Sequence, residues 1–227
     1  MNTKIFSLLT AFFMLLSVYS QTTNPLLTSV INKMKKVNDY SANVTIKADV
    51  PMIKVQAVNA KIYFKKENKF KVKSKSIAIL PKQGFTEVNS FLFNPKKYIS
   101  VETGSQMIGN KSTKIITVIP NENTNNIVLA KLWIDPINKL ILESEVTTRK
   151  SGTLKAKYSY GANKNFGLPA SILFTVDVKD FKMPKSFSSN PHRGSSKKTK
   201  TKKQGKILLN ISNYQINKGI PDSFFKK

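Results

Sequence analysis

The segment VNAKIYFKKENKFKVK, residues 58–73, decides the fold class because apolar and polar side chains alternate along both of its halves. A turn at Glu67-Asn68 separates the two halves. The apolar positions are Val58, Ala60, Ile62, Phe64, Phe70 and Val72, and lysines occupy most of the positions between them. A period of two is typical of strands that bury one face, so the segment predicts an antiparallel hairpin.

The same period recurs along most of the chain. The further predicted strands cover residues 40–48, 97–102, 114–119, 127–134, 140–148, 154–158, 172–178 and 206–216. The clearest hairpin joins residues 127–134 to 140–148 through the turn DPIN at residues 135–138. About ten consecutive antiparallel strands predict a mainly β (α+β) fold, a large curved sheet or barrel, and not an α/β enzyme. Residues 77–95 lack the period and predict a short helix or a lid-like loop.

One amphipathic helix precedes the strands. Asn24-Pro25 predicts an N-cap followed by proline at the first helical position. An apolar stripe then follows at helical spacing, at Leu26, Leu27, Val30, Ile31, Met34 and Val37. The stripe predicts a helix of about four turns that ends near Asn38 and covers the sheet.

The first twenty residues have the pattern of a cleaved signal peptide. A lysine at position 4 precedes an almost wholly apolar run, residues 5–18, and Val18-Tyr19-Ser20 predicts cleavage before Gln21. The run is shorter than the ~20 residues that span a bilayer, which disfavours the alternative of an uncleaved anchor. We therefore expect residues 21–227 to form a single exported domain, located in the periplasm. The sequence has no cysteine, which excludes disulfides and a lipid anchor on cysteine.

Lysine dominates the charge, with 38 Lys+Arg against 12 Asp+Glu and a formal net charge of +26. An exported protein meets anionic headgroups and surface polymers before nucleic acid, so transient contact with an anionic membrane surface is one interpretation. A merely solvated lysine-rich surface is the other. Residues 182–206 hold nine of the cations, no acid and the only histidine, and predict a disordered loop. That loop is either a polybasic tether or a solvated insertion.

The sequence offers few residues that could act as a catalytic nucleophile, base or metal ligand. There is no cysteine nucleophile, and His192 lies in the basic loop. The carboxylates are scattered, with Glu143 and Glu145 on an outward strand face, and no glycine-rich phosphate loop is present. A hydrolase that brings together two distant carboxylates stays open. We expect no enzyme activity, no metal and no cofactor.

Several short segments, in order, resemble the LolA-like family of periplasmic carriers that sort lipoproteins to the outer membrane. They are VNDYSA at residues 37–42, KIYFKKENKF at 61–70, LWID at 132–135, GLP at 167–169 and NKGIPDSFF at 217–225. The resemblance implies an unclosed β-barrel with a helical lid and a hydrophobic cavity for acyl chains. It also implies a monomer that takes cargo from an inner-membrane lipoprotein-releasing transporter and passes it to an outer-membrane acceptor. Related domains of this fold are stress sensors or general lipid binders, which is the alternative function.

The resemblance and the inward parity of the strands together give candidate lipid contacts. They are Ile62, Phe64, Phe70, Val72, Leu132, Ile134, Tyr158, Phe174 and Val176, with Leu26, Val30 and Met34 of the helix closing over them. Each is equally compatible with plain core. Lys66 stands where the family's carriers have an arginine that helps to hold the lid shut, so the resemblance implies a lid latch there. Lysine brings the charge without the guanidinium fork, and Glu67 replaces the family's following proline.

Overall fold

The computed structural model describes residues 23–50, 53–54, 56–67, 69–74, 91–121, 126–149, 152–177 and 204–226. The expected signal peptide, residues 77–90 and most of the basic loop lie outside the described residues. So does the side chain of Val176.

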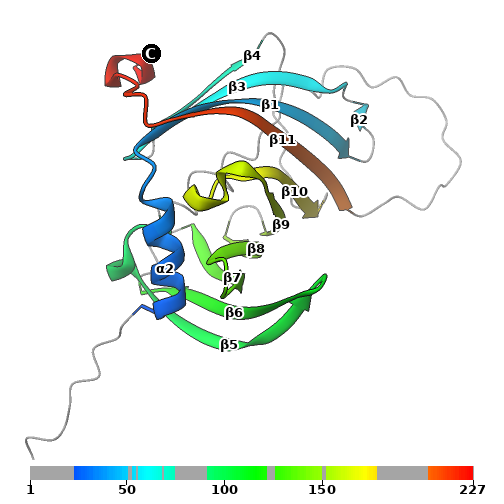
Figure 1. Ribbon diagram of the computed structural model, residues 1–227. Coiled ribbons are helices and arrows are strands. Elements are labelled where there is room, and N and C mark those ends of the chain that lie inside the picture. The colour runs from blue at the N-terminus through cyan, green and yellow to red at the C-terminus, as the bar shows by residue number, and fades with distance from the viewer. Residues whose placement is uncertain are drawn as a thin grey trace, which may run out of the picture.

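The described residues form a strongly curved, unclosed antiparallel sheet with one helix of regular length on its concave side (Figure 1). The helix is α2, Pro25–Met34. The strands are β1 (Asp39–Val50), β2 (Ile53–Lys54), β3 (Val58–Lys65), β4 (Lys69–Ser74), β5 (Tyr98–Ile108), β6 (Lys111–Pro120), β7 (Ile127–Asp135), β8 (Leu140–Thr148), β9 (Gly152–Tyr160), β10 (Pro169–Asp177) and β11 (Gln204–Ile216). Three short 3-10 turns complete the elements, η2 (Pro95–Lys97), η3 (Ala162–Phe166) and η5 (Asp222–Phe225). The predicted mainly β class and curved, unclosed sheet are confirmed.

The strand order is β4-β3-β1-β11-β10-β9-β8-β7-β6-β5, with β2 paired to β1 outside this path. Neighbours along this path follow one another in sequence, apart from the omitted β2, except at β11, which lies between β1 and β10. Tyr40 at the start of β1 is therefore paired with Ile216 at the end of β11. The edges of the sheet are β4 and β5, and among the described residues they do not pair with each other.

The helix begins where predicted and ends sooner. The side chain of Asn24 accepts hydrogen bonds from the N–H groups of Leu26 and Leu27 at 3.0 and 3.3 Å, which confirms the N-cap. The predicted end of the helix near Asn38 is wrong, because α2 stops at Met34. The N–H of Asn38 instead donates to the side chain of Asn217, 2.7 Å away. Asn217 directly follows β11, so Asn38 is bonded to the sheet and not to the helix.

Most strand limits differ from the prediction by a few residues, and the differences at β5 and β11 are the most informative. β5 continues to Ile108, because a register shift between Glu102 and Gly104 interrupts the alternation without ending the pairing with β6. β11 starts at Gln204, which pairs with Asp177 of β10. Residues 204–206, expected at the end of the disordered loop, are therefore strand.

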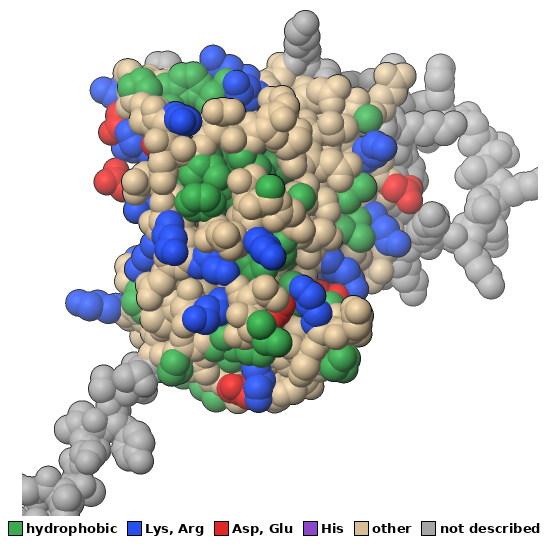
Figure 2. Space-filling model, viewed as in Figure 1, with side chains coloured by type: hydrophobic (Ala, Val, Ile, Leu, Met, Phe, Trp, Pro, Cys, Tyr) green, Lys and Arg blue, Asp and Glu red, His purple; other side chains and the backbone are tan. Residues whose placement is uncertain are grey.

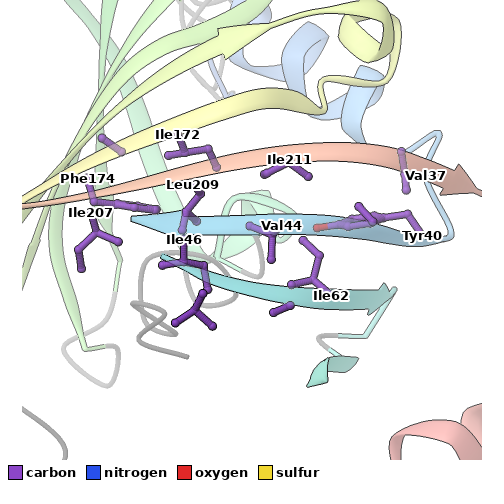
Figure 3. Close-up of a cluster of buried hydrophobic side chains, with 14 residues drawn as sticks. Val37, Tyr40, Val44, Ile46, Ile62, Ile172, Phe174, Ile207, Leu209 and Ile211 are labelled. Carbon is purple, nitrogen blue, oxygen red and sulfur yellow. The ribbon is translucent and has the colours of Figure 1, made fainter. Parts of the chain in front are cut away.

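The core consists of two clusters on the concave face. The first cluster lies on β1, β3, β9, β10 and β11 and includes Val44, Ile46, Ile62, Phe174 and Leu209 (Figure 3). The second cluster packs α2 on β5 to β8, through Leu27, Val30 and Ile31 against residues such as Ile116 and Leu132. Leu27 is fully buried, whereas Leu26 is only half-buried. The helix thus covers one half of the concave face, and its end approaches the other half.

Candidate ligand cavity

An apolar cavity of about 100 Å³ lies where the two core clusters meet. Its walls come from α2, from β1, β3, β7, β8, β9, β10 and β11, from residues 92–93 and from the segment around η3. Most of the lining side chains are aliphatic or aromatic, and Lys139 is the one charged residue among them. A pocket of this composition accepts an apolar group rather than a polar one.

Six of the twelve predicted lipid contacts line this cavity. They are Val30, Met34, Phe64, Leu132, Tyr158 and Phe174. Ile62 and Ile134 are buried within the two clusters, and Phe70, Val72 and Leu26 pack against the clusters from partly exposed positions. The backbone of Val176 pairs with Leu154 and Gly205. A role in lipid binding stays a prediction for all twelve.

The sequence reasoning missed several aromatic residues of the wall. They are Tyr40, Phe93, Tyr160, Phe166 and Tyr214. Tyr160 continues the parity of Ala156 and Tyr158, so the alternation of β9 could have found it. Tyr214 could not be found by parity counted from Leu209, because Asn213 adopts a left-handed φ of 54° and the register with β1 shifts nearby. A shift of one residue moves a side chain to the other face of the sheet.

Three of the tyrosines in the wall have hydroxyls that are hydrogen-bonded within the protein. Tyr160 donates to the carbonyl of Ile141 at 2.8 Å, and Tyr214 donates to the carbonyl of Pro169 at 2.9 Å. The hydroxyl of Tyr158 lies 2.9 Å from that of Ser144. Burial raises the pKa of Tyr158, Tyr160 and Tyr214, which keeps these phenols neutral. The rings therefore present apolar faces to the cavity while the polar atoms are occupied elsewhere.

Helix α2 is attached to the sheet at both of its ends. At the first end, the N–H of Asn24 donates to Ser100 Oγ of β5, 2.8 Å away. At the other end, Lys33 Nζ donates to the carbonyl of Asn138 in the β7–β8 turn. Met34 packs against Gly167, where an added Cβ would lie 3.0 Å from Met34 Cγ. These contacts hold α2 over the cavity, on the concave side of the sheet (Figure 1).

Comparisons with known proteins agree with this architecture at the level of the fold. No family model matches the sequence, and no curated protein matches it. Among solved structures, a putative outer membrane lipoprotein-sorting protein domain from Vibrio parahaemolyticus superposes with a TM-score of 0.57 at 10% identity, over 88% of this chain and 95% of that chain. A LolA superfamily protein from Nitrosomonas europaea gives 0.51 at 12% identity, over 88% and 97%. A DUF1329 family protein from Desulfovibrio piger gives 0.54 at 11% identity, over 90% and 98%.

The fold is LolA-like. In this LolA-like fold, Lys66 secures the connection that follows α2 and not α2 itself. Its N–H donates to the carbonyl of Asn38 at 2.8 Å, and its Nζ donates to Asn38 Oδ1 at 2.6 Å. The predicted latch role of Lys66 stays a prediction, and the structure adds Lys33 and Asn24 as residues that tie the helix directly to the sheet.

The C-terminal segment fastens the same connection from the other side. Asn217 accepts from the N–H of Asn38 and donates to the carbonyl of Lys36, at 2.7 and 2.9 Å. The carboxylate of Asp39, which is buried, accepts from the N–H groups of Lys218 and Gly219 at 3.0 to 3.2 Å. A buried carboxylate with such donors is compensated. In this part of the LolA-like fold, hydrogen bonds tie the segment after α2 to the C-terminal segment.

Carboxylates on the outer face of the sheet are paired with lysines. Glu143 and Glu145 lie next to each other on β8, and each forms an ion pair across the ladder to β9, with Lys157 at 2.7 Å and Lys155 at 2.9 Å. Within the described part of the chain, no group of three or more His, Asp or Glu residues is placed to hold a metal ion. Nor is any described helix long and apolar enough to cross a membrane.

Proposed function

We propose that the protein binds the acyl chain of a lipid in this cavity and carries it through an aqueous compartment. The observation that supports the proposal is the cavity itself, with an apolar wall shared by two core clusters and a helix attached across it. The proposal is for binding and not for catalysis. In its more specific form the compartment is the periplasm, the cargo is the acyl part of a lipoprotein, and delivery runs from an inner-membrane transporter to an outer-membrane acceptor.

The cavity is too small to accept an acyl chain without a movement of its wall. Sites for ligands of moderate size have volumes of about 300–1,000 Å³, several times the volume enclosed here. An acyl chain must therefore displace part of the wall. Helix α2 is held by side-chain packing and a few hydrogen bonds, whereas the strands are held by continuous ladders. We infer that α2 swings outward when cargo enters.

The energetics of that opening suit a carrier. Burial of each methylene group is worth about 0.8 kcal/mol, so a chain of ~16 carbons gains on the order of 10 kcal/mol. Separating α2 from the second cluster exposes apolar side chains such as Val30 and Met34 and opposes this gain. The difference between the two quantities sets the affinity, and a small difference permits release at the destination.

Two measurements test the proposal. Mass spectrometry of lipid extracted from the protein purified from its own host should find acylated species. The delipidated protein should take up a fluorescent acyl probe, and Met34→Trp, which fills the cavity wall, should reduce that uptake. Ile137→Trp is the matched control, because Ile137 is 87% exposed and does not line the cavity. A protein that purifies without lipid and takes up no probe would overturn the proposal.

A further inference from the structure

Lysines gather at the end of the cavity where α2 stops. Lys139, in the β7–β8 turn, lines the cavity itself. Lys33, the residue before the end of α2, is half-buried and donates to the carbonyl next to Lys139, that of Asn138. Lys164 lies in η3, which contacts α2. Figure 2 shows Lys and Arg side chains around the hydrophobic ones on the face where α2 lies.

A second hollow lies beside this end of the cavity. It has Leu140, Tyr158 and Tyr160 in common with the cavity, and its own wall includes Lys111, Lys157 and Lys164. The lysines therefore border the end of the apolar space, and Lys139 is part of its wall. An apolar cavity with cations at its end matches the two parts of an amphiphile.

The positive charge at this site is only partly balanced. Lys157 is paired with Glu143 at 2.7 Å, and Lys111 lies 3.4 Å from the buried carboxylate of Asp135. Asp135 also accepts from the N–H groups of Ile137 and Asn138, which uses its oxygens within the turn. In the described part of the chain, no ion pair links Lys33, Lys139 or Lys164 to a carboxylate.

The electrostatics of Lys33 reflect this excess. Burial lowers the pKa of its ammonium, and the positive charges of Lys139, Lys36 and Lys164 lower that pKa further, with only Asp135 acting in the opposite direction. A partly buried cation among other cations is stabilised by an anion that it can contact. Lysines that were simply solvated would point away from one another into water, whereas Lys33 is directed at the turn that carries Lys139.

We propose that these lysines bind the negatively charged head of an amphiphile whose acyl chain occupies the cavity. The ligand class is an acyl chain with a carboxylate or phosphate next to it, as opposed to a neutral or zwitterionic lipid. This inference rests on the proposed acyl-binding function and adds the chemistry of the headgroup. Lys33, Lys139 and Lys164 supply charge-assisted hydrogen bonds to the head, and the aromatic wall supplies the apolar contact.

The test compares pairs of ligands that have the same kind of acyl chain and differ mainly in the charge of the head. The carboxylate arm uses dansyl-labelled undecanoic acid and its methyl ester, and the phosphate arm uses displacement of the ester by lysophosphatidylglycerol or by zwitterionic lysophosphatidylcholine. We expect the protein to bind the anionic member of at least one pair about tenfold more tightly, which corresponds to ~1.4 kcal/mol. A preference in one arm alone identifies the head as carboxylate or phosphate.

Variants assign the preference to the lysines. Lys33→Met, Lys139→Met and Lys164→Met, combined, keep much of the aliphatic stem and remove the charges. They should abolish the preference for the anion, measured as the ratio of the two affinities, because losing the Lys33 tether to Asn138 changes the binding of both ligands alike and cancels in that ratio. Lys47→Met is the control, because Lys47 is an exposed residue of β1 outside both hollows.

The two proposals fail in different ways. If neither arm shows tighter binding of the anionic ligand and the triple variant leaves the ratio of the two affinities unchanged, the headgroup inference is overturned while acyl binding stands. If neither acid nor ester binds to a folded protein, the acyl-binding proposal itself is overturned. Circular dichroism of each variant establishes that it is folded before affinities are compared.

Discussion

Gly167 lies so close to Met34 that a single added carbon would meet it, since a Cβ on Gly167 would lie 3.0 Å from Met34 Cγ. Gly167 also has a φ of +67°, which side chains of L-residues rarely adopt. Gly109 in the β5–β6 turn has a similar φ of +60° but nothing within 4 Å of such a Cβ. Comparing these two glycines therefore distinguishes the cost of backbone strain, which they share, from the cost of contact with α2, which only Gly167 has.

We expect Gly167→Ala to destabilise the protein more than Gly109→Ala. Both variants incur the left-handed backbone cost of about 1–2 kcal/mol, and only Gly167→Ala also displaces Met34. Urea unfolding measures the two losses. Combining Gly167→Ala with Met34→Ala should recover part of the difference in a double-mutant cycle. Equal losses of unfolding free energy in the two variants would show that the Met34 side chain moves aside at no cost.

The contact between Asn24 and Ser100 predicts how readily α2 opens. Ser100→Ala removes the acceptor of the Asn24 N–H and should lower the stability of the attached helix by about 1–3 kcal/mol. Amide hydrogen exchange across α2 should accelerate accordingly. Ser29→Ala is the control, because Ser29 Oγ bonds only to the carbonyl of Pro25 within the exposed face of the same helix. Unchanged exchange in Ser100→Ala would rule out this contact as a restraint.

Asn217 combines two roles that substitutions can separate. Its φ of +55° favours glycine or asparagine, and its side chain bonds to Asn38 and Lys36. Asn217→Gly keeps the backbone geometry and should cost about 1–2 kcal/mol through the lost hydrogen bonds. Asn217→Ala adds backbone strain and should cost more. Thermal unfolding gives the order, and an Asn217→Gly variant as stable as the wild type would show that the two bonds contribute nothing net.

The C-terminal turn should respond to acid through Asp222. Hydrogen bonds from Lys65 and Lys69, at 2.6 and 2.8 Å, lower the pKa of Asp222 to about 2. Because the folded pKa is below the unfolded value of ~3.9, the attachment of η5 to β3 and β4 is intact above about pH 4. It is lost progressively as the pH falls toward 2.

Carbon NMR of the Asp222 carboxyl group follows this titration directly, which avoids confusion with Asp135, whose pKa is also lowered. Replacing Lys65 and Lys69 by methionine should move the midpoint up toward 3.8, the ordinary value for this carboxyl group. A midpoint that stays near 2 in that variant would mean that other groups set the pKa.

Local sequence predicts the strands well because the two faces of a strand are encoded within a few residues. Thus the alternation around Ile62 and Phe64 correctly places both on the concave face. The end of α2 depends instead on Asn217, which lies 179 positions from Asn38, and no local pattern carries that information. Likewise, parity cannot separate Ile62, which is in the core, from Phe64, which lines the cavity, because the distinction arises from the curvature of the whole sheet and the position of α2.

The place of β11 in the sheet has a consequence for synthesis. Among the described residues, strands β1 to β4 and strands β5 to β10 are connected in the sheet only through β11, which the ribosome makes after all of them. Until residues 204–216 have emerged, the chain can form two separate partial sheets but not the wall that they share. Pairing of Tyr40 with Ile216 closes a loop of almost the entire domain, so this step is also slow. The wall of the cavity is therefore complete only after β11 has paired with both β1 and β10.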